Sequence, residues 1–134
     1  MINGVLKSPL KIVRLNDGNV MHAMKNKDQG YTQFGEAYFS IINSGAIKGW
    51  KRHKKMYCNL SVPHGKVKFV IKLEDKFKEF EISNSSPALL TIFPNTFFAF
   101  KGLEDLNVIS NLASLEHDSK ESENIPLKEI NYEW

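Results

Sequence analysis

The chain has 134 residues, of which 42% are hydrophobic, so it is long enough for one domain with a buried core and too short for a separate cofactor domain. We therefore expect residues 1–134 to form a single domain. The formal net charge is only +3. No apolar stretch approaches the roughly 20 residues of a membrane span, which predicts no membrane partner. A single cysteine, Cys58, and the absence of a signal-peptide pattern predict a cytoplasmic protein.

The predicted elements are strands. Short runs rich in Val, Ile, Phe and Tyr alternate with Gly, Pro, Asn and Asp, a pattern typical of an antiparallel sandwich or barrel. The predicted strands cover residues 5–14, 36–42, 56–62, 66–73, 77–83, 88–92, 96–101 and 108–112. In the run 66–73 apolar and lysine residues alternate, which indicates a sheet with one wet face. The fold class is therefore all-β.

Two polar or mixed segments follow the last of these strands. Residues 117–124 are polar enough to predict an exposed loop, and residues 130–134 alternate apolar and polar, which favours a final strand.

A basic cluster precedes residue 56. Five cationic residues fall within eight positions and predict a local anion site: Lys48, Lys51, Arg52, Lys54 and Lys55. Zinc-finger spacing, heptads and an RNP1-type signature are missing from the sequence, so we expect no nucleic acid as partner. On an extended segment Lys51, His53 and Lys55 share a face, and these cations lower the pKa of His53 and favour it as a base. A solvated strand edge is the alternative interpretation.

Several segments, in their order, resemble the sugar-nucleotide branch of the cupins: the dTDP-4-dehydrorhamnose 3,5-epimerases and the sugar 3,4-ketoisomerases. The segments are Glu36-Ala37-Tyr38-Phe39-Ser40, Lys48-Gly49-Trp50-Lys51-Arg52-His53, Gly65-Lys66-Val67, Ile92-Phe93-Pro94 before a Phe-rich run, and Tyr132-Glu133-Trp134. The resemblance covers most of the chain. It implies a cupin jelly-roll barrel and activity on a nucleotide-linked 4-keto-6-deoxyhexose.

The sequence also departs from the family pattern. Lys51 stands where the epimerases have their usual histidine, and His53 matches the second His of the ketoisomerases' His-x-His pair. His117 best matches the epimerases' catalytic tyrosine. A family lysine falls around Cys58 or Asn59, and a family histidine falls on Phe98.

Epimerisation next to a 4-keto group needs a base, an acid on the opposite face and positive charge near the enolate oxygen. The resemblance implies these roles for His53, His117 and Lys51, in that order. The substrate-binding residues we expect are Lys48, Trp50, Arg52, Lys55, Tyr38 and Asn59, because a basic patch with aromatics holds a diphosphate and stacks on a base.

A metal is not expected, because one histidine beside repelling cations replaces the ligand set of metal-binding cupins. No cofactor is expected either, since the reaction needs no redox chemistry. The expected partners are a dTDP- or CDP-linked sugar and a second copy of the chain, since a small jelly roll exposes sheet edges.

The first hypothesis is thus a C3 and/or C5 epimerase that serves a surface polysaccharide such as lipopolysaccharide O-antigen. A 3,4-ketoisomerase on the same substrate class is the second. A noncatalytic nucleotide-sugar-binding cupin is the third, motivated by the missing family residues.

Overall fold

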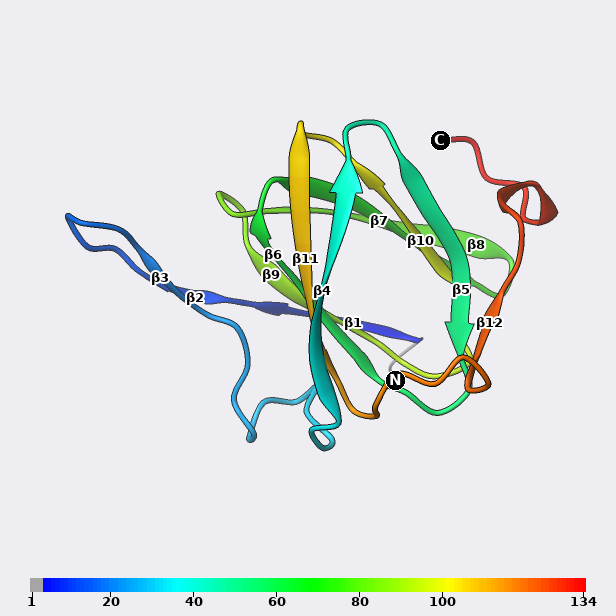
Figure 1. Cartoon of the computed structure of the whole chain (residues 1–134), viewed down its shortest axis with the longest axis horizontal. Helices are drawn as coiled ribbons and strands as arrows, with labels where there is room; N and C mark the ends of the chain where they lie inside the picture. The colour runs from blue at the N-terminus through cyan, green and yellow to red at the C-terminus, as the bar shows by residue number, and fades with distance from the viewer. Residues whose placement is uncertain (1–3) are drawn as a thin grey trace.

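The computed structural model describes residues 4–134, which form two five-stranded antiparallel sheets and a small hairpin (Figure 1). The first sheet has the order β1-β9-β6-β11-β4: β1 (Val5–Pro9), β9 (Ala88–Ile92), β6 (Cys58–His64), β11 (Leu106–Ala113) and β4 (Glu36–Asn43). The second has the order β12-β5-β10-β7-β8: β12 (Ser122–Asn124), β5 (Ile47–His53), β10 (Phe98–Gly102), β7 (Lys66–Leu73) and β8 (Lys76–Ser83). The all-β prediction is confirmed.

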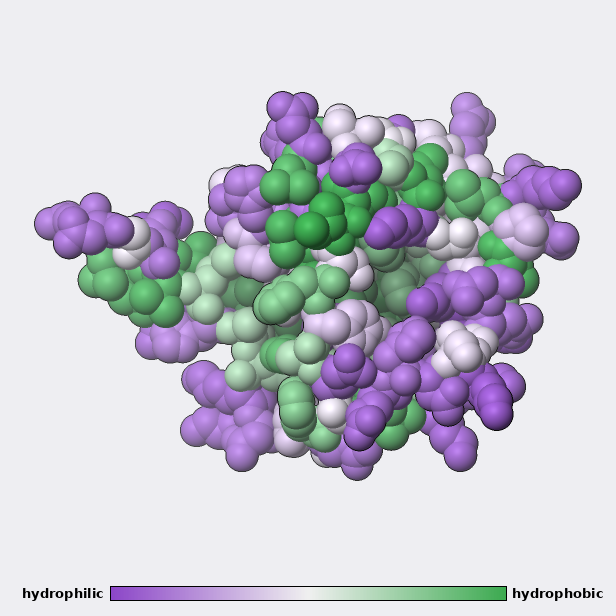
Figure 2. Space-filling view, viewed as in Figure 1, coloured by the Kyte–Doolittle hydropathy of each residue, from purple (hydrophilic) through white to green (hydrophobic). Residues whose placement is uncertain are grey.

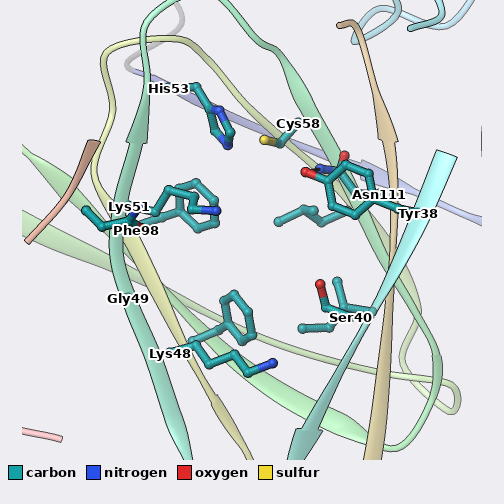
Figure 3. A pocket seen from close by; sticks show the side chains of 13 residues that line it. Tyr38, Ser40, Lys48, Gly49, Lys51, His53, Cys58, Phe98 and Asn111 are labelled. Atoms are coloured by element: carbon teal, nitrogen blue, oxygen red, sulfur yellow. Dashed lines mark hydrogen bonds between the residues drawn. The ribbon is translucent and has the colours of Figure 1, made fainter. Parts of the chain in front are cut away.

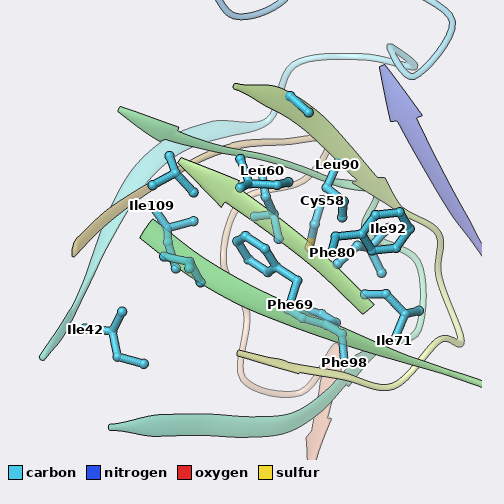
Figure 4. Close-up of a cluster of buried hydrophobic side chains, with 14 of the residues drawn as sticks. Ile42, Cys58, Leu60, Phe69, Ile71, Phe80, Leu90, Ile92, Phe98 and Ile109 are labelled. Carbon is cyan, nitrogen blue, oxygen red and sulfur yellow. The ribbon is translucent and has the colours of Figure 1, made fainter. Parts of the chain in front are cut away.

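The main core lies between the two sheets (Figure 4). The alternation in β7 places Val67, Phe69 and Ile71 in this core with no exposed surface, as the sequence predicts. Leu90 and Ile92 of β9 and Phe98 of β10 pack into the same cluster. Burying this apolar surface supplies the main stabilising free energy.

The sequence predicted one strand over residues 5–14, but the structure divides this run into two strands. β1 pairs with β9, whereas β2 (Lys11–Val13) pairs with β3 (Val20–His22) in a separate hairpin that projects from the body (Figure 1). Pro9, with no N–H to donate, stands where the two strands separate. The hairpin exposes Leu15 and Val20.

The carboxy-terminal residues also differ from the prediction. Residues 122–124 form the edge strand β12 instead of an exposed loop, and residues 130–134 form no strand. A single 3-10 turn, η1 (Leu127–Glu129), precedes them. Ile130, Tyr132 and Trp134 pack on Trp50 and Val70 on the outer face of the second sheet. This cover explains why Val70, on the face predicted to be wet, is fully buried.

The exposed face of the first sheet carries an apolar patch. Phe39 and Ile41 of β4 and Leu106 of β11 keep 70%, 56% and 45% of their surface exposed, and apolar side chains gather over these strands in Figure 2. Within residues 4–134 the structure contains no helix of the length and apolarity required to cross a membrane.

Candidate active site

A pocket of about 320 Å³ lies between the two sheets (Figure 3). One wall comes from β5 and β10 and carries Lys48, Lys51, His53, Phe98 and Phe100. The facing wall comes from β4, β6 and β11 and carries Tyr38, Ser40, Cys58, Leu60, Ile109 and Asn111. Each wall thus combines a few polar groups with apolar side chains, as in many small-molecule sites.

His53 is the last residue of β5, and its side chain is only 3% exposed. Its Nδ1 lies 2.7 Å from Oε1 of Glu121. Because an ionised carboxylate only accepts hydrogen bonds, Nδ1 carries the proton, and in the neutral ring the lone pair is on Nε2. Nε2 is buried and has no hydrogen-bond partner among residues 4–134, so it is free to accept a proton from a bound molecule.

The pKa of His53 lies below its ordinary value, chiefly because burial disfavours the charged imidazolium. Glu121 acts in the opposite direction, and Lys51 adds to the lowering. The lowering predicted from the neighbouring lysines is present for Lys51, but burial of the ring is the larger cause. The neutral ring is a competent base at neutral pH.

Glu121 was not among the predicted residues. Its Oε2 accepts hydrogen bonds from the backbone N–H groups of Lys55 (2.7 Å) and Met56 (2.9 Å). Burial raises the pKa of Glu121, but these two N–H groups and His53 outweigh burial and lower it. Glu121 is therefore an ionised, fixed partner that orients the imidazole.

Lys48 and Lys51 both line the pocket because β5 contains an irregularity. Phe98 pairs with Lys51 but Phe100 pairs with Lys48, so two residues of β5 lie opposite the single residue Ala99. Without this bulge, strand alternation would place the two lysines on opposite faces. The Lys51 side chain points into the pocket beside Phe98 (Figure 3). The Lys48 ammonium donates to the backbone carbonyl of Ile41 (2.7 Å), which bridges β5 and β4.

Tyr38 lies on the facing wall, and its phenol oxygen accepts a hydrogen bond from the Asn111 amide (2.9 Å). Burial, the largest contribution, raises the pKa of Tyr38 to about 12. The phenol therefore keeps its proton at neutral pH and can donate it. Tyr38 was predicted as a stacking aromatic, and its hydroxyl is the more informative group.

His117 does not line the pocket, which corrects its predicted role as the acid. The residue is exposed, and its backbone N–H donates to the Glu36 carboxylate (2.7 Å). Its ring meets the edge of Tyr38 at a centroid distance of 6.4 Å. His117 lies four residues beyond the end of β11, outside the strands that form the pocket walls. The sequence match to the family tyrosine therefore did not predict where its side chain lies.

Four predicted substrate-binding residues also lie away from the pocket. Trp50 projects to the opposite face of β5, where the carboxy-terminal residues bury it completely. Arg52 shares that face, pairs with Glu123 and stacks on Phe97. Lys55 follows the end of β5 and is exposed.

Asn59 is the fourth of these corrections. It is buried on the side of β6 away from the pocket, where it accepts a hydrogen bond from Thr91 (2.7 Å) and donates to the carbonyl of Leu112 (3.1 Å). Strand alternation explains the placement, since its neighbours Cys58 and Leu60 face the pocket. Asn59 thus satisfies buried polar groups within the sheet.

Cys58 contributes a thiol to the pocket wall. Its side chain is 1% exposed, and burial raises its pKa to about 12, so the thiol is protonated. Within residues 4–134 no three His, Cys, Asp or Glu side chains gather into a group that would hold a metal ion.

Neither a family model nor a curated protein matches the amino-acid sequence. Solved structures, in contrast, match the fold of this chain. A dTDP sugar isomerase from Desulfovibrio desulfuricans G20 superposes with a TM-score of 0.82 at 27% identity, over 93% of this chain and 85% of that one. The chain has the fold of the nucleotide-sugar isomerases.

Two further isomerase structures agree with this result. A sugar 3,4-ketoisomerase from Thermoanaerobacterium thermosaccharolyticum, in complex with TDP, gives a TM-score of 0.79 at 22% identity over 91% of this chain and 88% of that one. A dTDP-4-dehydrorhamnose 3,5-epimerase from Sulfolobus tokodaii gives 0.84 at 17% identity, over 96% and 81%. The resemblance inferred from the sequence motifs is confirmed, and with it the cupin-like sugar epimerase fold.

Proposed function

We propose that the chain is an isomerase of a nucleotide-linked 4-keto-6-deoxyhexose, and that it inverts C3 and/or C5 through an enolate. The observation that carries this proposal is the pair of proton-transfer groups on facing walls. The free Nε2 of His53 is on one wall, and the neutral phenol of Tyr38 is on the other. Inversion requires that a proton leaves one face of the sugar ring and returns to the other.

His53 removes the proton from the carbon next to the keto group, and the C–H electron pair moves into the enolate. The Lys51 ammonium stabilises the negative oxygen that develops. Tyr38 then delivers its proton to the opposite face of the carbon. Solvent reprotonates the resulting phenolate and accepts the proton that His53 holds, so no net proton is consumed.

The sugar and the nucleotide occupy different parts of the site. A volume of about 320 Å³ lies at the lower end of ligand pockets, which fits the hexose but not the whole nucleotide sugar. Lys48, which bridges β5 and β4, exchanges its carbonyl partner for the diphosphate. The nucleotide, dTDP or CDP, then lies outside the barrel.

A 3,4-ketoisomerase is the second candidate. Identity to the ketoisomerase structure is 22%, above the 17% to the 3,5-epimerase, which favours this alternative. Lys51 in place of the first family histidine disfavours it, since proton transfer between neighbouring carbons on one face is easier with two adjacent bases. A 3-keto product seen by NMR would decide for it.

The test is solvent deuterium exchange and product formation in heavy water, on a panel of dTDP- and CDP-linked 4-keto-6-deoxy sugars. We expect His53→Asn to lose exchange and product together, by about 10²- to 10⁴-fold. Tyr38→Phe should lose the inverted product and keep exchange with retention, because His53 still removes and returns a proton. His117→Gln is the matched control and should remain close to wild type.

Three outcomes would contradict the proposal. No exchange in the wild-type protein with any member of the panel excludes the epimerase, and tight binding without exchange or turnover indicates a noncatalytic binding protein. A loss of inversion in His117→Gln with normal Tyr38→Phe would return the acid role to His117.

We also propose a homodimer. The projecting hairpin exposes Leu15 and Val20, and the patch of Phe39, Ile41 and Leu106 exposes apolar surface on the same chain. Such surfaces on a small protein mark association sites. A monomeric mass in light scattering at micromolar concentration would refute the dimer.

The proposed setting is the cytoplasm, since the buried free thiol of Cys58 suits a reducing compartment. The product would serve a surface polysaccharide such as lipopolysaccharide O-antigen.

A further inference from the structure

The segment that follows β11 runs along the outside of β5 (Figure 1), and we name residues 117–134 the strap. It brings Glu121 to His53. Close to this contact, the Lys54 N–H donates to the Glu121 carbonyl (2.9 Å). The three residues of β12 pair with the last three of β5, with Ser122 opposite His53. The strap is thus attached to the strand that carries the proposed base.

These ladder contacts are few. A three-residue edge strand frays readily, because edge backbone bonds are exposed and little apolar surface is buried beneath them. Glu123 pairs with Arg52 across the outer face, but both side chains are about half exposed. An exposed ion pair contributes little to holding two segments together.

The Glu121 carboxylate adds its own bonds to His53, Lys55 and Met56, and a second attachment lies further along the strap. Ile125 and Trp50 exchange two backbone hydrogen bonds of 3.0 and 3.1 Å. Tyr132 and Trp134 then cover Trp50, with ring centroids at 6.2 and 6.0 Å, and contact each other at 4.9 Å. The Lys68 ammonium lies 5.2 Å from the Tyr132 ring centroid and 5.7 Å from that of Trp134. Aromatic pairs and cation–π contacts of this kind stabilise beyond the area they bury.

We propose that the aromatic cluster of Trp50, Tyr132 and Trp134 is a positioning element that holds the strap closed, so that Glu121 stays against His53. The inference rests on the proposed role of His53 as the base. The cluster is on the opposite face of β5 from the pocket and touches no reacting group. It acts through the strap, and only while Glu121 is present.

The electrostatic consequence can be read from the groups that face the imidazole. Glu121 is the anion that raises the pKa of His53, whereas burial, Lys51 and His117 lower it. The Tyr38 phenol and the Cys58 thiol are neutral at the pocket wall. If the strap loosens, Glu121 withdraws while the barrel wall, with Phe98 stacked at 6.5 Å, still buries the imidazole, so the pKa of His53 falls further and the ring loses the contact that fixes its tautomer. The base becomes weaker and less well oriented.

The experiment combines an NMR titration of the His53 ring with the rate of deuterium exchange. The chain has four histidines, and His53→Asn assigns the signal. We expect Trp134→Ala and Glu121→Gln each to move the His53 pKa downward. Trp134→Ala should slow exchange by about 2- to 30-fold, and Trp134→Phe should restore both quantities. Lys128→Ala, an exposed change within the strap, is the matched control and should leave both unchanged.

A double variant separates a positioning role from general destabilisation. If the aromatic cluster acts through Glu121, Trp134→Ala has no further effect on the His53 pKa or on exchange in the Glu121→Gln background. Additive effects, a His53 pKa that rises in Trp134→Ala because the ring becomes exposed, or a folded Trp134→Ala protein with a wild-type pKa and rate, would overturn the inference. The titration needs no substrate, so it tests the strap even if the proposed activity fails.

Discussion

Asn107 is fully buried, and its amide joins three separate parts of the chain. Oδ1 accepts hydrogen bonds from the N–H groups of Lys66 (2.9 Å) and Glu104 (3.2 Å), and Nδ2 donates to the carbonyls of Ile42 (3.0 Å) and Glu104 (2.9 Å). At about 1 kcal/mol for each bond, Asn107→Ala removes about 4 kcal/mol of unfolding free energy. That is a large share of the total for a small protein, which is about 0.05–0.15 kcal/mol per residue.

The measurement is urea unfolding followed by tryptophan fluorescence, with the slope against urea compared between variants. Asn84→Ala, in the exposed turn between β8 and β9, is the matched control and should change stability by less than about 0.5 kcal/mol. A loss below about 1 kcal/mol in Asn107→Ala at an unchanged slope would refute the reasoning, because the four bonds would then be replaced by water.

Two further predictions concern the site. Because the folded state lowers the pKa of His53 below 6.5, the unfolded chain binds a proton more readily, and stability should fall as pH drops below about 6.5. Urea unfolding at pH 7.5 and 5.5 measures this, and an equal pH dependence in His53→Asn would contradict it. Gly49→Ala should destabilise by about 1–3 kcal/mol, since a Cβ would lie 2.3 Å from the Ala99 Cβ. Gly18→Ala is the control: φ is also positive there, but no described atom lies within 4 Å of the added Cβ, so an equal loss would refute the clash.

Much of the fold was predictable because strand alternation and turn residues are local signals. The run 66–73 matches β7 because its apolar and lysine residues alternate, and 88–92 matches β9 because it is a short apolar run bounded by turn residues. The same rule placed Lys51 and His53 on one face of an extended segment. Both line the pocket.

The remaining parts of the site depend on contacts that no local pattern encodes. The β5 bulge changes parity between Lys48 and Lys51, so both lysines line the pocket although they are three positions apart. Glu121 lies 68 positions from His53 in a segment whose polarity predicts a loop. Only the tertiary pairing of β12 with β5 identifies it. The sequence shows that this segment is rich in carboxylates, but it does not show which of them contacts His53.

The alkylation rate of the chain's single thiol, Cys58, can be used to measure how often the barrel opens. Cys58 is only 1% exposed in the pocket wall, and burial raises its pKa to about 12, so the closed protein presents neither an accessible thiol nor a reactive thiolate. Alkylating reagents therefore react only after the barrel opens. The labelling rate at neutral pH therefore reports the free energy of that opening, without an added fluorophore or an engineered residue. A molecule seated between His53 and Tyr38 should slow labelling in proportion to its occupancy. Mass spectrometry of the alkylated chain would then rank nucleotide sugars by affinity, including those that the protein does not convert.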